Sequence, residues 1–441
     1  MSKFKEVIKT FFPFVRTIKN ATLNSMSQLE KHYYIYKAKK LQERKLEELK
    51  GKNKIKCVIL LFSTSLFRDY LYQLLASNER FEVFIVVSPE CSHGEEYKKK
   101  CLQTTYENMV KKGYSNVLLG YDIEKDTYLD IKKEINPDII IYTNPYRGLI
   151  SEEHYVTKFL DCLPIYIPYY INNTVEYKMA YDELLHNVVW RYYVETEWHK
   201  KLSKKYSTNC GRNVVVTGYS GIDRFLDKNY RPSSAQWKIE GATHKRIIWA
   251  PHQTIDPSKE MYYSAFLFIA DEMTNFAKKY KDQIQIAFKP HPLLVNSLYK
   301  VWGKERTDAY YDEWRNMDNT CIVEGEYADL FLTSDAIIHD SASFITEYLM
   351  INKPALRTYN ERDPKTQFND FSLACLDHYY KAYNAEDVEK FIKDVVKDND
   401  PMKEARTNFI QKNLLPPQGG IPSENIIADI LLSIDNQILY K

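Results

Sequence analysis

The sequence has no apolar run that approaches the roughly 18 residues of a membrane-spanning helix, and a transmembrane protein is therefore not expected. No small-residue cleavage site follows the first apolar residues, so we expect no signal peptide. Excess charge is also lacking, because the formal net charge of the 441 residues is only +2 at pH 7. This balance gives no support for general binding to nucleic acid.

Motifs for metals, disulfides and nicotinamide cofactors are missing as well. The seven cysteines are scattered without metal-ligand spacing or a disulfide framework, which favours reduced thiols in a cytosolic protein. The first expected strand-to-helix turn has no G-x-G-x-x-G sequence, which argues against a nicotinamide-binding domain. An Asp-x-Asp pair occurs at Asp398 and Asp400, but it follows a Lys-rich helix in an expected surface loop. We therefore predict no metal ion and no cofactor.

What the sequence does have is the composition of a folded protein with more than one domain. Hydrophobic residues make up 44% of the chain and charged residues 27%, as in soluble globular proteins. The length is sufficient for two domains of usual size with extensions. We therefore looked for two folding units.

The first 50 residues are strongly basic, with 12 Lys and Arg against 5 Asp and Glu. Within residues 1–20, apolar side chains are interleaved with Lys and Arg in the pattern of an interfacial helix, which Pro13 would kink. This segment could bind an anionic membrane surface or pack on the body of the protein, and the sequence leaves both open. Residues 28–50 are expected to form a Lys- and Glu-rich helix with a solvated or bundle-forming face.

Strand and helix patterns alternate between residues 55 and 217. Apolar, β-rich runs bounded by polar residues indicate buried strands, and such alternation predicts a doubly wound parallel sheet. The expected strands span residues 55–62, 81–87, 116–119, 138–142, 162–168, 188–194 and 213–217. The expected helices span residues 66–76, 93–112, 126–134 and 198–206.

A second alternating region follows a junction at residues 218–237 that is rich in turn-forming residues. Its expected strands span residues 247–250, 284–288, 321–323 and 336–338. Its expected helices span residues 261–280, 293–301 and 308–317, and two closing helices at 385–397 and 423–439 could return to the first domain. We predict an α/β fold of two Rossmann-like domains, divided into residues 1–50, 51–225, 226–400 and 401–441.

Small hydroxyl residues follow the strand expected at residues 336–338. Asp340 and Ser341 are good helix N-cap residues, and apolar side chains repeat at helical spacing behind them. A helix that begins at the carboxyl end of a parallel strand directs free backbone N–H groups and the positive end of its dipole into the crevice. Together with the hydroxyls of Ser341 and Ser343, this arrangement predicts a phosphate site.

A cation and an imidazole follow the strand expected at residues 284–288. Lys289 and His291 come directly after it, in a turn stiffened by two prolines. Both should emerge at the same sheet edge as Ser341, where they could clamp a diphosphate. His252 occupies the equivalent end of another strand. Alternation along the strand points His339 away from Asp340, and we expect a buried, hydrogen-bonded histidine there.

These segments carry a resemblance to a known family, the CDP-glycerol glycerophosphotransferases of teichoic-acid and capsule synthesis. Two further stretches, at residues 216–223 and 249–252, are similar to the domain-junction and first C-terminal-strand motifs of that family. The resemblance covers residues 213–354. The matching residues are Val216-Thr217-Gly218-Tyr219 with Asp223, Trp249-Ala250-Pro251-His252, Lys289-Pro290-His291-Pro292, Ser334-Asp335, Asp340-Ser341-x-Ser343, Glu347-Tyr348 and Lys353-Pro354.

The resemblance implies a GT-B fold, in which the C-terminal domain holds the nucleotide of the donor. It implies catalytic roles for His291, His252 and Lys289. It assigns binding of the donor to Ser341, Ala342, Ser343, Glu347, Asp340, Pro290 and Gly218, with Glu347 on the ribose hydroxyls.

The catalytic base stays open. Members of the family usually carry a His-Gly pair in the first domain, and this chain has Pro168-Tyr169-Tyr170 in that region instead. Tyr169 and Asn172 could line the acceptor side, and structural roles are an equal alternative. Glu195 and His199 can be explained by capping and surface solvation as well as by an active site.

We therefore hypothesise a transferase that moves glycerol phosphate, or a related polyol phosphate, from a CDP-activated donor such as CDP-glycerol. The acceptor would be a polyprenyl-linked or glycan precursor of a cell-surface polymer, at the cytoplasmic face of the membrane. Without a metal ion, the charge of the leaving nucleotide would be met by Lys289, His291 and the segment Ser341–Ser343. The alternatives are a GT-B glycosyltransferase that uses a nucleotide sugar and a non-catalytic, nucleotide-binding assembly subunit. The sequence does not indicate the oligomeric state.

Overall fold

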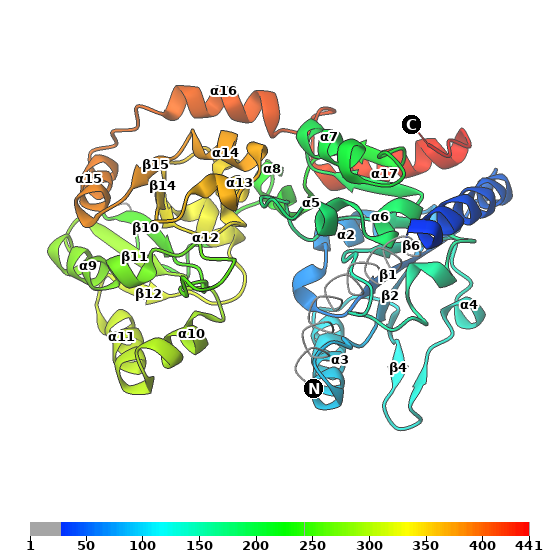
Figure 1. Cartoon of the computed structure of the whole chain (residues 1–441), viewed down its shortest axis with the longest axis horizontal. Helices are drawn as coiled ribbons and strands as arrows, with labels where there is room; N and C mark the ends of the chain where they lie inside the picture. Colours follow the sequence, from blue (N-terminus) through cyan, green and yellow to red (C-terminus); the bar gives the residue numbers. More distant parts are fainter. Residues whose placement is uncertain (1–27, 242, 441) are drawn as a thin grey trace, which may run out of the picture.

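The computed structural model of the chain describes residues 28–241 and 243–440, and it forms two α/β lobes (Figure 1). The interfacial helix predicted over residues 1–20 lies outside the described residues. Among the helices of the described part, none is both long enough and apolar enough to cross a bilayer.

The N-terminal lobe is built on a seven-stranded parallel sheet with the order β3-β2-β1-β6-β7-β8-β9. Its strands are β1 (Ile55–Leu61), β2 (Phe81–Val87), β3 (Val117–Leu119), β6 (Ile139–Tyr142), β7 (Leu163–Tyr166), β8 (Arg191–Val194) and β9 (Val214–Val216). Its helices are η1 (Thr64–Leu66), α2 (Asp69–Ser77), α3 (Glu95–Lys111), α4 (Ile131–Glu134), η2 (Val156–Lys158), α5 (Tyr177–Tyr181), α6 (Leu184–Val188) and α7 (Glu197–Tyr206). Two short segments, η3 (Ser220–Ile222) and α8 (Asp223–Leu226), lead towards the second lobe.

The C-terminal lobe is built on a six-stranded parallel sheet with the order β12-β11-β10-β13-β14-β15. Its strands are β10 (Lys245–Ala250), β11 (Ile284–Phe288), β12 (Thr320–Ile322), β13 (Ala336–His339), β14 (Ala355–Thr358) and β15 (Tyr380–Ala382). Its helices are α9 (Phe266–Lys279), α10 (Leu294–Val301), α11 (Lys304–Asn316), α12 (Ala328–Thr333), α13 (Phe344–Leu349), η4 (Pro364–Thr366), α14 (Asp370–Leu376), α15 (Ala385–Val396) and α16 (Lys403–Asn413), before α17 (Pro422–Asp435).

Both sheets are buried on two faces, which confirms the predicted doubly wound arrangement. Successive residues of a strand point to opposite faces. In β1, Cys57 and Ile59 belong to one core while Val58 belongs to the other. In β10, Trp249 and Ile248 divide in the same way between the two cores of the C-terminal lobe. Continuous apolar strands are therefore required, as the sequence has them.

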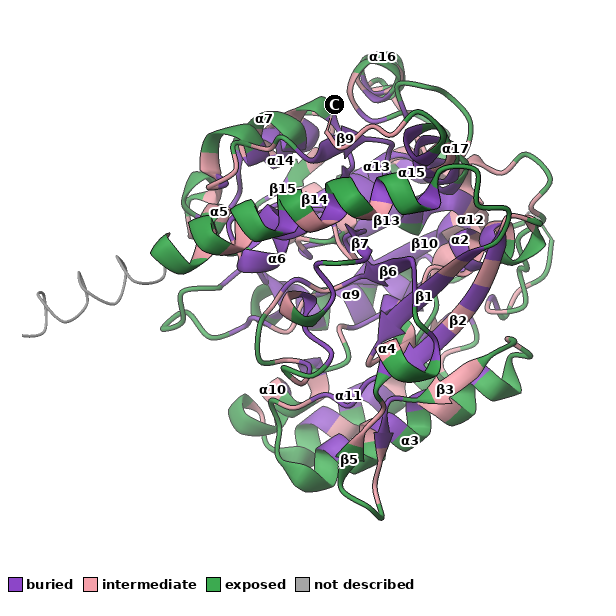
Figure 2. Cartoon of the chain, turned by 90° about the vertical axis from the view of Figure 1, so that its right-hand side faces the viewer, coloured by how far each residue is buried: buried purple, intermediate pink, exposed green. Residues whose placement is uncertain are grey.

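The helix over residues 28–49 packs on the N-terminal lobe. Leu46 and Leu49 join one core of that lobe and Ala38 joins the other. The Nε2 of the buried Gln42 donates to the carbonyl oxygen of Val188 at 2.7 Å. The outer face of the helix is exposed, as Figure 2 shows. The helix therefore has one solvated face, as predicted, and one face that covers the domain.

Three predicted elements differ from the structure. Residues 121–128 form a small hairpin of β4 (Tyr121–Asp122) and β5 (Thr127–Tyr128), so the helix expected at 126–134 is reduced to α4. Helix α9 begins at Phe266 rather than near 261, because the backbone N–H groups of Tyr263 and Ser264 donate to Thr254 within the preceding loop. Helix α15 packs on the C-terminal sheet and does not return to the N-terminal lobe.

Helix α17 does return, as predicted. Four isoleucines of α17 complete a core of the N-terminal lobe: Ile426, Ile427, Ile430 and Ile434. The preceding helix α16 stays with the other lobe through Ile410. In Figure 1 the chain after α16 passes from one lobe to the other. The C-terminal segment therefore joins the two lobes by packing.

A buried hydrogen-bond network also links the lobes. The side chain of Asn173 donates to the carbonyl of Ala342 at 2.9 Å and accepts from Thr346 at 3.0 Å. The side chain of Asn369 donates to the carbonyl of Asn172 at 2.8 Å. Asn172 is thus engaged in holding the lobes together, a structural alternative to the acceptor role considered from the sequence.

Gly218 stands where the chain leaves β9, with a φ of +90°. A Cβ atom added there would lie 2.8 Å from Pro416 and 2.9 Å from Pro422, at the entry to α17. We expect Gly218→Ala to lower the free energy of unfolding by about 2–4 kcal/mol, because backbone strain and overpacking add. Urea unfolding would measure the change.

The matched control is Gly113→Ala, where φ is +80° and no atom lies within 4 Å of the added Cβ. That variant carries the backbone strain alone, about 1–2 kcal/mol. If both variants lost the same free energy of unfolding, Pro416 and Pro422 would have to move away from the added Cβ at position 218 without destabilising the fold.

Candidate active site

Three neighbouring strands of the C-terminal sheet end beside one another. β10 lies between β11 and β13, with Trp249 opposite Phe288 and Ala250 opposite His339. The segments that follow them carry Pro251-His252, Lys289-Pro290-His291 and Asp340-Ser341-Ala342-Ser343. The structure therefore brings these residues to one sheet edge, where ligands of open α/β sheets bind.

Direct bonds tie these three segments together. The backbone N–H of His291 donates to the carbonyl of Pro251 at 3.0 Å. The backbone N–H of His252 donates to a carboxylate oxygen of Asp340 at 2.6 Å. The three segments that follow β10, β11 and β13 are therefore held to one another by hydrogen bonds.

His252 and His291 form a pair of imidazoles, with ring centroids 4.7 Å apart and the rings tilted by 63°. In His291, Nδ1 accepts from the backbone N–H of Leu293 at 3.1 Å. In His252, Nδ1 lies 2.9 Å from the hydroxyl of Thr254 and 3.4 Å from the backbone nitrogen of Thr254. Because a backbone N–H can only donate, Nδ1 of His252 is an acceptor. Because Nδ1 accepts in each neutral ring, the proton resides on Nε2. Both rings can thus offer an Nε2–H to an anion.

Burial keeps both imidazoles neutral. It lowers the pKa of His252 to about 3, with contributions from His291 and Arg357. It also lowers the pKa of His291, with a smaller contribution from Lys289. A bound polyanion would stabilise the charged forms and oppose these shifts.

Lys289 is buried and turned towards the β12–α12 side of the edge. Its Nζ donates to the carbonyl of Gly325 at 3.0 Å and lies 5.5 Å from the centre of the Tyr327 ring. Burial lowers its pKa, and the carboxylates of Glu324 and Glu326 oppose that effect. A lysine that lacks a close carboxylate partner retains capacity for an anionic ligand.

The expectation that Asp340 caps the following helix is wrong. One oxygen of its carboxylate accepts from the backbone of His252, and the other accepts from the Ser264 hydroxyl and the Ala265 N–H, each at 2.9 Å. Burial raises its pKa to about 6 despite these bonds. Asp340 therefore organises the loop between β10 and α9.

The helix expected directly behind Asp340 begins later and is short. α13 starts at Phe344 and has 6 residues, and the side chain of its N-cap, Ser343, makes no capping bond. Ser341 is buried, whereas Ser343 is exposed. The segment Ser341–Ser343 thus presents hydroxyls and backbone at the edge, but not the long helix dipole that the sequence indicated.

Glu347 is buried inside the lobe junction. Its carboxylate accepts from the hydroxyl of Tyr327 at 2.6 Å, and the nearby hydroxyl of Tyr219 also lowers its pKa. Burial outweighs these bonds and the nearby Arg68 and raises the pKa of Glu347 to about 7. Tyr327 therefore contacts Lys289 with its ring and Glu347 with its hydroxyl.

Gly218 is not brought to this edge. It packs against Pro416 and Pro422 and lines a separate pocket in the N-terminal lobe. His339 is buried, as expected, but neither of its ring nitrogens has a hydrogen-bond partner within the described residues.

Two further candidates raised by the sequence have structural contacts. Asp223 accepts from the backbone N–H of Ser423 at 3.1 Å and thereby ties α8 to α17. The carbonyl oxygen of Tyr169 accepts from the hydroxyl of Tyr219 at 2.8 Å.

Sequence reasoning missed Arg357, which lies in β14. Its guanidinium is buried and donates to the carbonyls of Ser341 at 3.1 Å and Asp340 at 3.0 Å. Its Nε has no partner within the described residues. An arginine inside the apolar run Ala355–Thr358 was the available signal, because arginine is rarely buried without a function or a partner.

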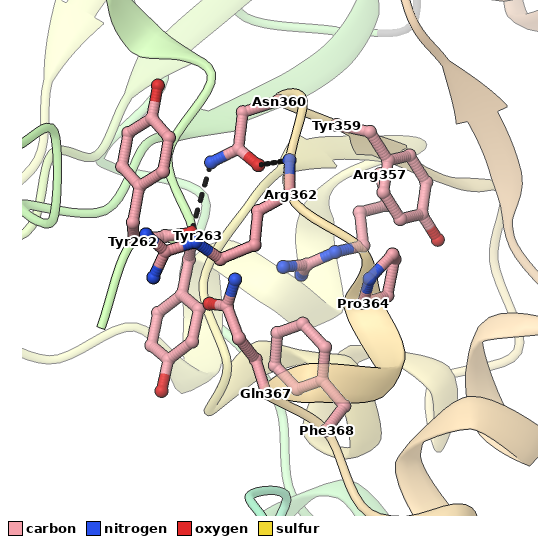
Figure 3. A pocket seen from close by; sticks show the side chains of 9 residues that line it. All are labelled: Tyr262, Tyr263, Arg357, Tyr359, Asn360, Arg362, Pro364, Gln367 and Phe368. Atoms are coloured by element: carbon pink, nitrogen blue, oxygen red, sulfur yellow. Dashed lines mark hydrogen bonds between the residues drawn. The ribbon is translucent and has the colours of Figure 1, made fainter. Parts of the chain in front are cut away.

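Arg357 also lines a small pocket that opens to solvent (Figure 3). Tyr263 connects this pocket to the imidazole pair, because its ring lies 5.5 Å from that of His252. The pocket is lined by Tyr262, Tyr263, Arg357, Tyr359, Asn360, Arg362, Pro364, Gln367 and Phe368. Aromatic faces and guanidinium groups of this kind suit a polar organic anion.

No site for a metal ion was found among residues 28–241 and 243–440, where no three His, Cys, Asp or Glu side chains converge suitably. The absence of a metal from the reaction stays a prediction.

Several solved structures share the architecture of this chain. One is a UDP-N-acetylglucosamine 2-epimerase from Listeria monocytogenes, at 14% identity and a TM-score of 0.54, covering 87% of this chain and 97% of that chain. Another is the UDP-GlcNAc 2-epimerase from Neisseria meningitidis bound to UDP-GlcNAc, at 14% identity and a TM-score of 0.53. The match covers 86% of this chain and 100% of that chain. A third is the wall teichoic acid polymerase TagF from a crystal soaked with CDPG, at 11% identity and a TM-score of 0.52, covering 94% and 99%. The fold is therefore GT-B, as predicted.

The particular family follows from the sequence. Residues 172–432, more than half of the chain, match the family model described as CDP-Glycerol:Poly(glycerophosphate) glycerophosphotransferase. The chain belongs to this family, and it is a transferase of the glycerophosphotransferase type. Among curated proteins, no sequence matches it significantly.

Proposed function

We propose that the protein transfers glycerol phosphate from CDP-glycerol to a hydroxyl group at the end of a cell-surface polymer precursor. The observation that carries this proposal is the common edge of β10, β11 and β13. There, the imidazole pair, Lys289 and the segment Ser341–Ser343 come from the ends of three adjacent strands. Such an array of donors suits a diphosphate.

In the proposed reaction, an acceptor oxygen attacks the phosphorus atom that carries glycerol. A bond forms between them, the bond from that phosphorus to the bridging oxygen breaks, and CMP leaves. The proton of the acceptor hydroxyl passes to a base. His291, His252 and Lys289 would stabilise the charge that develops on the leaving phosphate.

The remaining donor contacts are carried over from the resemblance to the family. Ser341, Ala342, Ser343 and Pro290 would lie along the phosphates, Asp340 would hold the His252 loop, and Glu347 would meet the ribose. The basic segment 1–20 stays a candidate for contact with anionic lipid at the cytoplasmic membrane face, where a polyprenyl-linked acceptor would reside.

A ligand panel in thermal melting tests the donor. CDP-glycerol at 100 times its dissociation constant should stabilise the protein by about 2.7 kcal/mol, which is a measurable rise in Tm. CDP-ribitol, CMP-sugars and UDP-sugars are the comparison ligands. Release of CMP from CDP-glycerol in the presence of poly(glycerophosphate) then separates an enzyme from a nucleotide-binding subunit. Selective stabilisation by a UDP-sugar would overturn the donor assignment.

A further inference from the structure

The small pocket beside Arg357 lies one strand away from the candidate donor site. Arg357 belongs to β14, which pairs with β13, and adjacent strands of a sheet are about 4.8 Å apart. Its two Nη atoms donate to the carbonyls of Asp340 and Ser341. On the pocket wall, the ring of Tyr263 lies 5.5 Å from that of His252. The pocket therefore adjoins the edge of β10, β11 and β13 through direct contacts.

Two polar atoms of this pocket are buried and have no hydrogen-bond partner within residues 28–241 and 243–440. They are the Nε of Arg357 and the Oε1 of Gln367. Arg357 is 2% exposed and Gln367 is 8% exposed. In Figure 3 both side chains extend into the space between the labelled residues. Because a buried polar atom without a partner is rare and costly, these two atoms indicate a bound group in the pocket.

Other polar groups of the wall are already engaged. The guanidinium of Arg362 donates to the carbonyls of Pro257 at 3.0 Å and Lys259 at 2.8 Å. The side chain of Asn360 accepts from the backbone N–H of Arg362 at 3.0 Å and donates to the carbonyl of Tyr262 at 3.0 Å. These bonds hold the wall of the pocket in place without satisfying the two unpartnered atoms.

The two unpartnered atoms determine which chemical group fits. A guanidinium N–H can only donate, and the oxygen of an amide can only accept. A hydroxyl group does both, whereas an ionised phosphate oxygen only accepts and an ammonium group only donates. The cavity volume is about 10 Å³, close to the smallest space that holds one water molecule, and a hydroxyl oxygen is of that size. Because the pocket opens to solvent, the carbon that carries the hydroxyl can stay at its mouth.

We propose that this pocket receives the terminal hydroxyl of the glycerol moiety of the donor. The Nε of Arg357 donates to that hydroxyl, and the Oε1 of Gln367 accepts from it. This role rests on the proposed function and makes the two side chains determinants of donor specificity.

The order of the strands supports this placement. Lys289 follows β11 and is turned towards the β12 side, and the imidazole pair follows β10 and β11. The pocket lies on the other side of β13, at β14. A donor whose diphosphate lies across the middle strands, with its nucleoside towards β12, would therefore extend its glycerol towards the pocket.

The test compares the wild type with Gln367→Met, which keeps the length of the side chain and removes the acceptor. Binding of CDP-glycerol, measured by thermal-shift titration, should weaken about tenfold, because the ligand hydroxyl loses its partner. Binding of CDP, which carries no glycerol, should stay within twofold of the wild type. In CMP release, the KM for CDP-glycerol should rise by the same factor as the dissociation constant, and the KM for poly(glycerophosphate) should not change.

Gln236→Met is the matched control. The Oε1 of Gln236 is likewise buried without a partner in the described part of the chain, but Gln236 does not line the pocket. Its affinity for CDP-glycerol should match that of the wild type. The Tm of ligand-free Gln367→Met should equal or exceed that of the wild type, since a buried unpartnered acceptor is removed. A group that only supports the fold would instead lower the Tm when replaced.

A second arm changes the ligand instead of the protein. CDP-propane-1,2-diol lacks the terminal hydroxyl and should bind the wild type about tenfold more weakly than CDP-glycerol does. Gln367→Met should bind the two ligands equally, because the variant and the altered ligand remove the same interaction. Equal binding of both ligands by the wild type would contradict the proposal even if Gln367→Met did not fold.

The remaining outcomes also overturn the proposal while the proposed function stands. An equal loss of affinity for CDP and CDP-glycerol in Gln367→Met would mean that Gln367 shapes the phosphate site. Unchanged affinity for CDP-glycerol would leave the two atoms to a bound water only. A raised KM for poly(glycerophosphate) alone would assign the pocket to the acceptor. A wild type that neither binds CDP-glycerol nor releases CMP from it would overturn the proposed function and the glycerol pocket together.

Discussion

His291→Ala is expected to lower the rate of CMP release by about 100-fold or more while leaving the fold intact. The N–H of Leu293 donates to Nδ1 of this ring, which puts the proton on Nε2, and the ring lies 4.7 Å from that of His252 at the shared strand edge. Removal of one such preorganised donor typically costs 10²–10³ in rate, about 3–4 kcal/mol. Steady-state kinetics of CMP release from CDP-glycerol would measure the loss.

The control is His32→Ala, because His32 is exposed on the helix over residues 28–49. A melting temperature near that of the wild type is expected for both variants, since His291 is only half-buried in a loop. Near-normal turnover of His291→Ala would remove this imidazole from the reaction and leave Lys289 and the segment Ser341–Ser343 as the charge-stabilising groups.

The alternation of strands and helices could be predicted from the sequence because it is local. A parallel strand covered on both faces must be apolar throughout, and runs such as Ile55–Leu61 and Ile284–Phe288 satisfy that requirement. The common edge of β10, β11 and β13 followed from the same reasoning, since polar residues after such strands must emerge at their carboxyl ends.

Tertiary hydrogen bonds could not be predicted in this way. Asp340 has the sequence context of a helix cap, yet its carboxylate bonds to the loop at Ser264, far away in the chain. The Tyr121–Tyr128 hairpin was missed because its two-residue strands carry no periodic signal. Arg357 was missed because its bonds go to backbone carbonyls, which have no signature in the sequence.

The contribution of the N-terminal lobe was the least predictable part of the candidate site. The family match begins at residue 172, so most of the N-terminal sheet lies before it. Pro168, in the region where the family's usual His-Gly is replaced, lines the same pocket as Glu195. The sequence left Glu195 open between capping or solvation and an active-site role, and the structure shows it buried whereas Glu197 is exposed.

Arg357→Ala is expected to lower the free energy of unfolding by about 3–5 kcal/mol and to abolish stabilisation by the donor. The guanidinium bridges the carbonyls of Asp340 and Ser341 and lies 4.6 Å from the centre of the Phe368 ring. Its removal leaves two carbonyls without their donor and opens a cavity where a fully buried side chain stood. Urea unfolding with and without CDP-glycerol would measure both effects.

Two further variants separate the loss of the planar guanidinium from the loss of a positive charge. Arg357→Lys keeps a charge but cannot span two carbonyls with a planar fork, so an intermediate stability and weak donor stabilisation are expected. Arg315→Ala removes an arginine whose ion pair with Asp312 is exposed, and it should change stability by less than about 0.5 kcal/mol. If Arg357→Ala unfolded at the wild-type urea midpoint yet lost its response to CDP-glycerol, Arg357 would have to act on the ligand directly. If it lost stability but kept the response, the segment Ser341–Ser343 would not depend on this guanidinium for its shape.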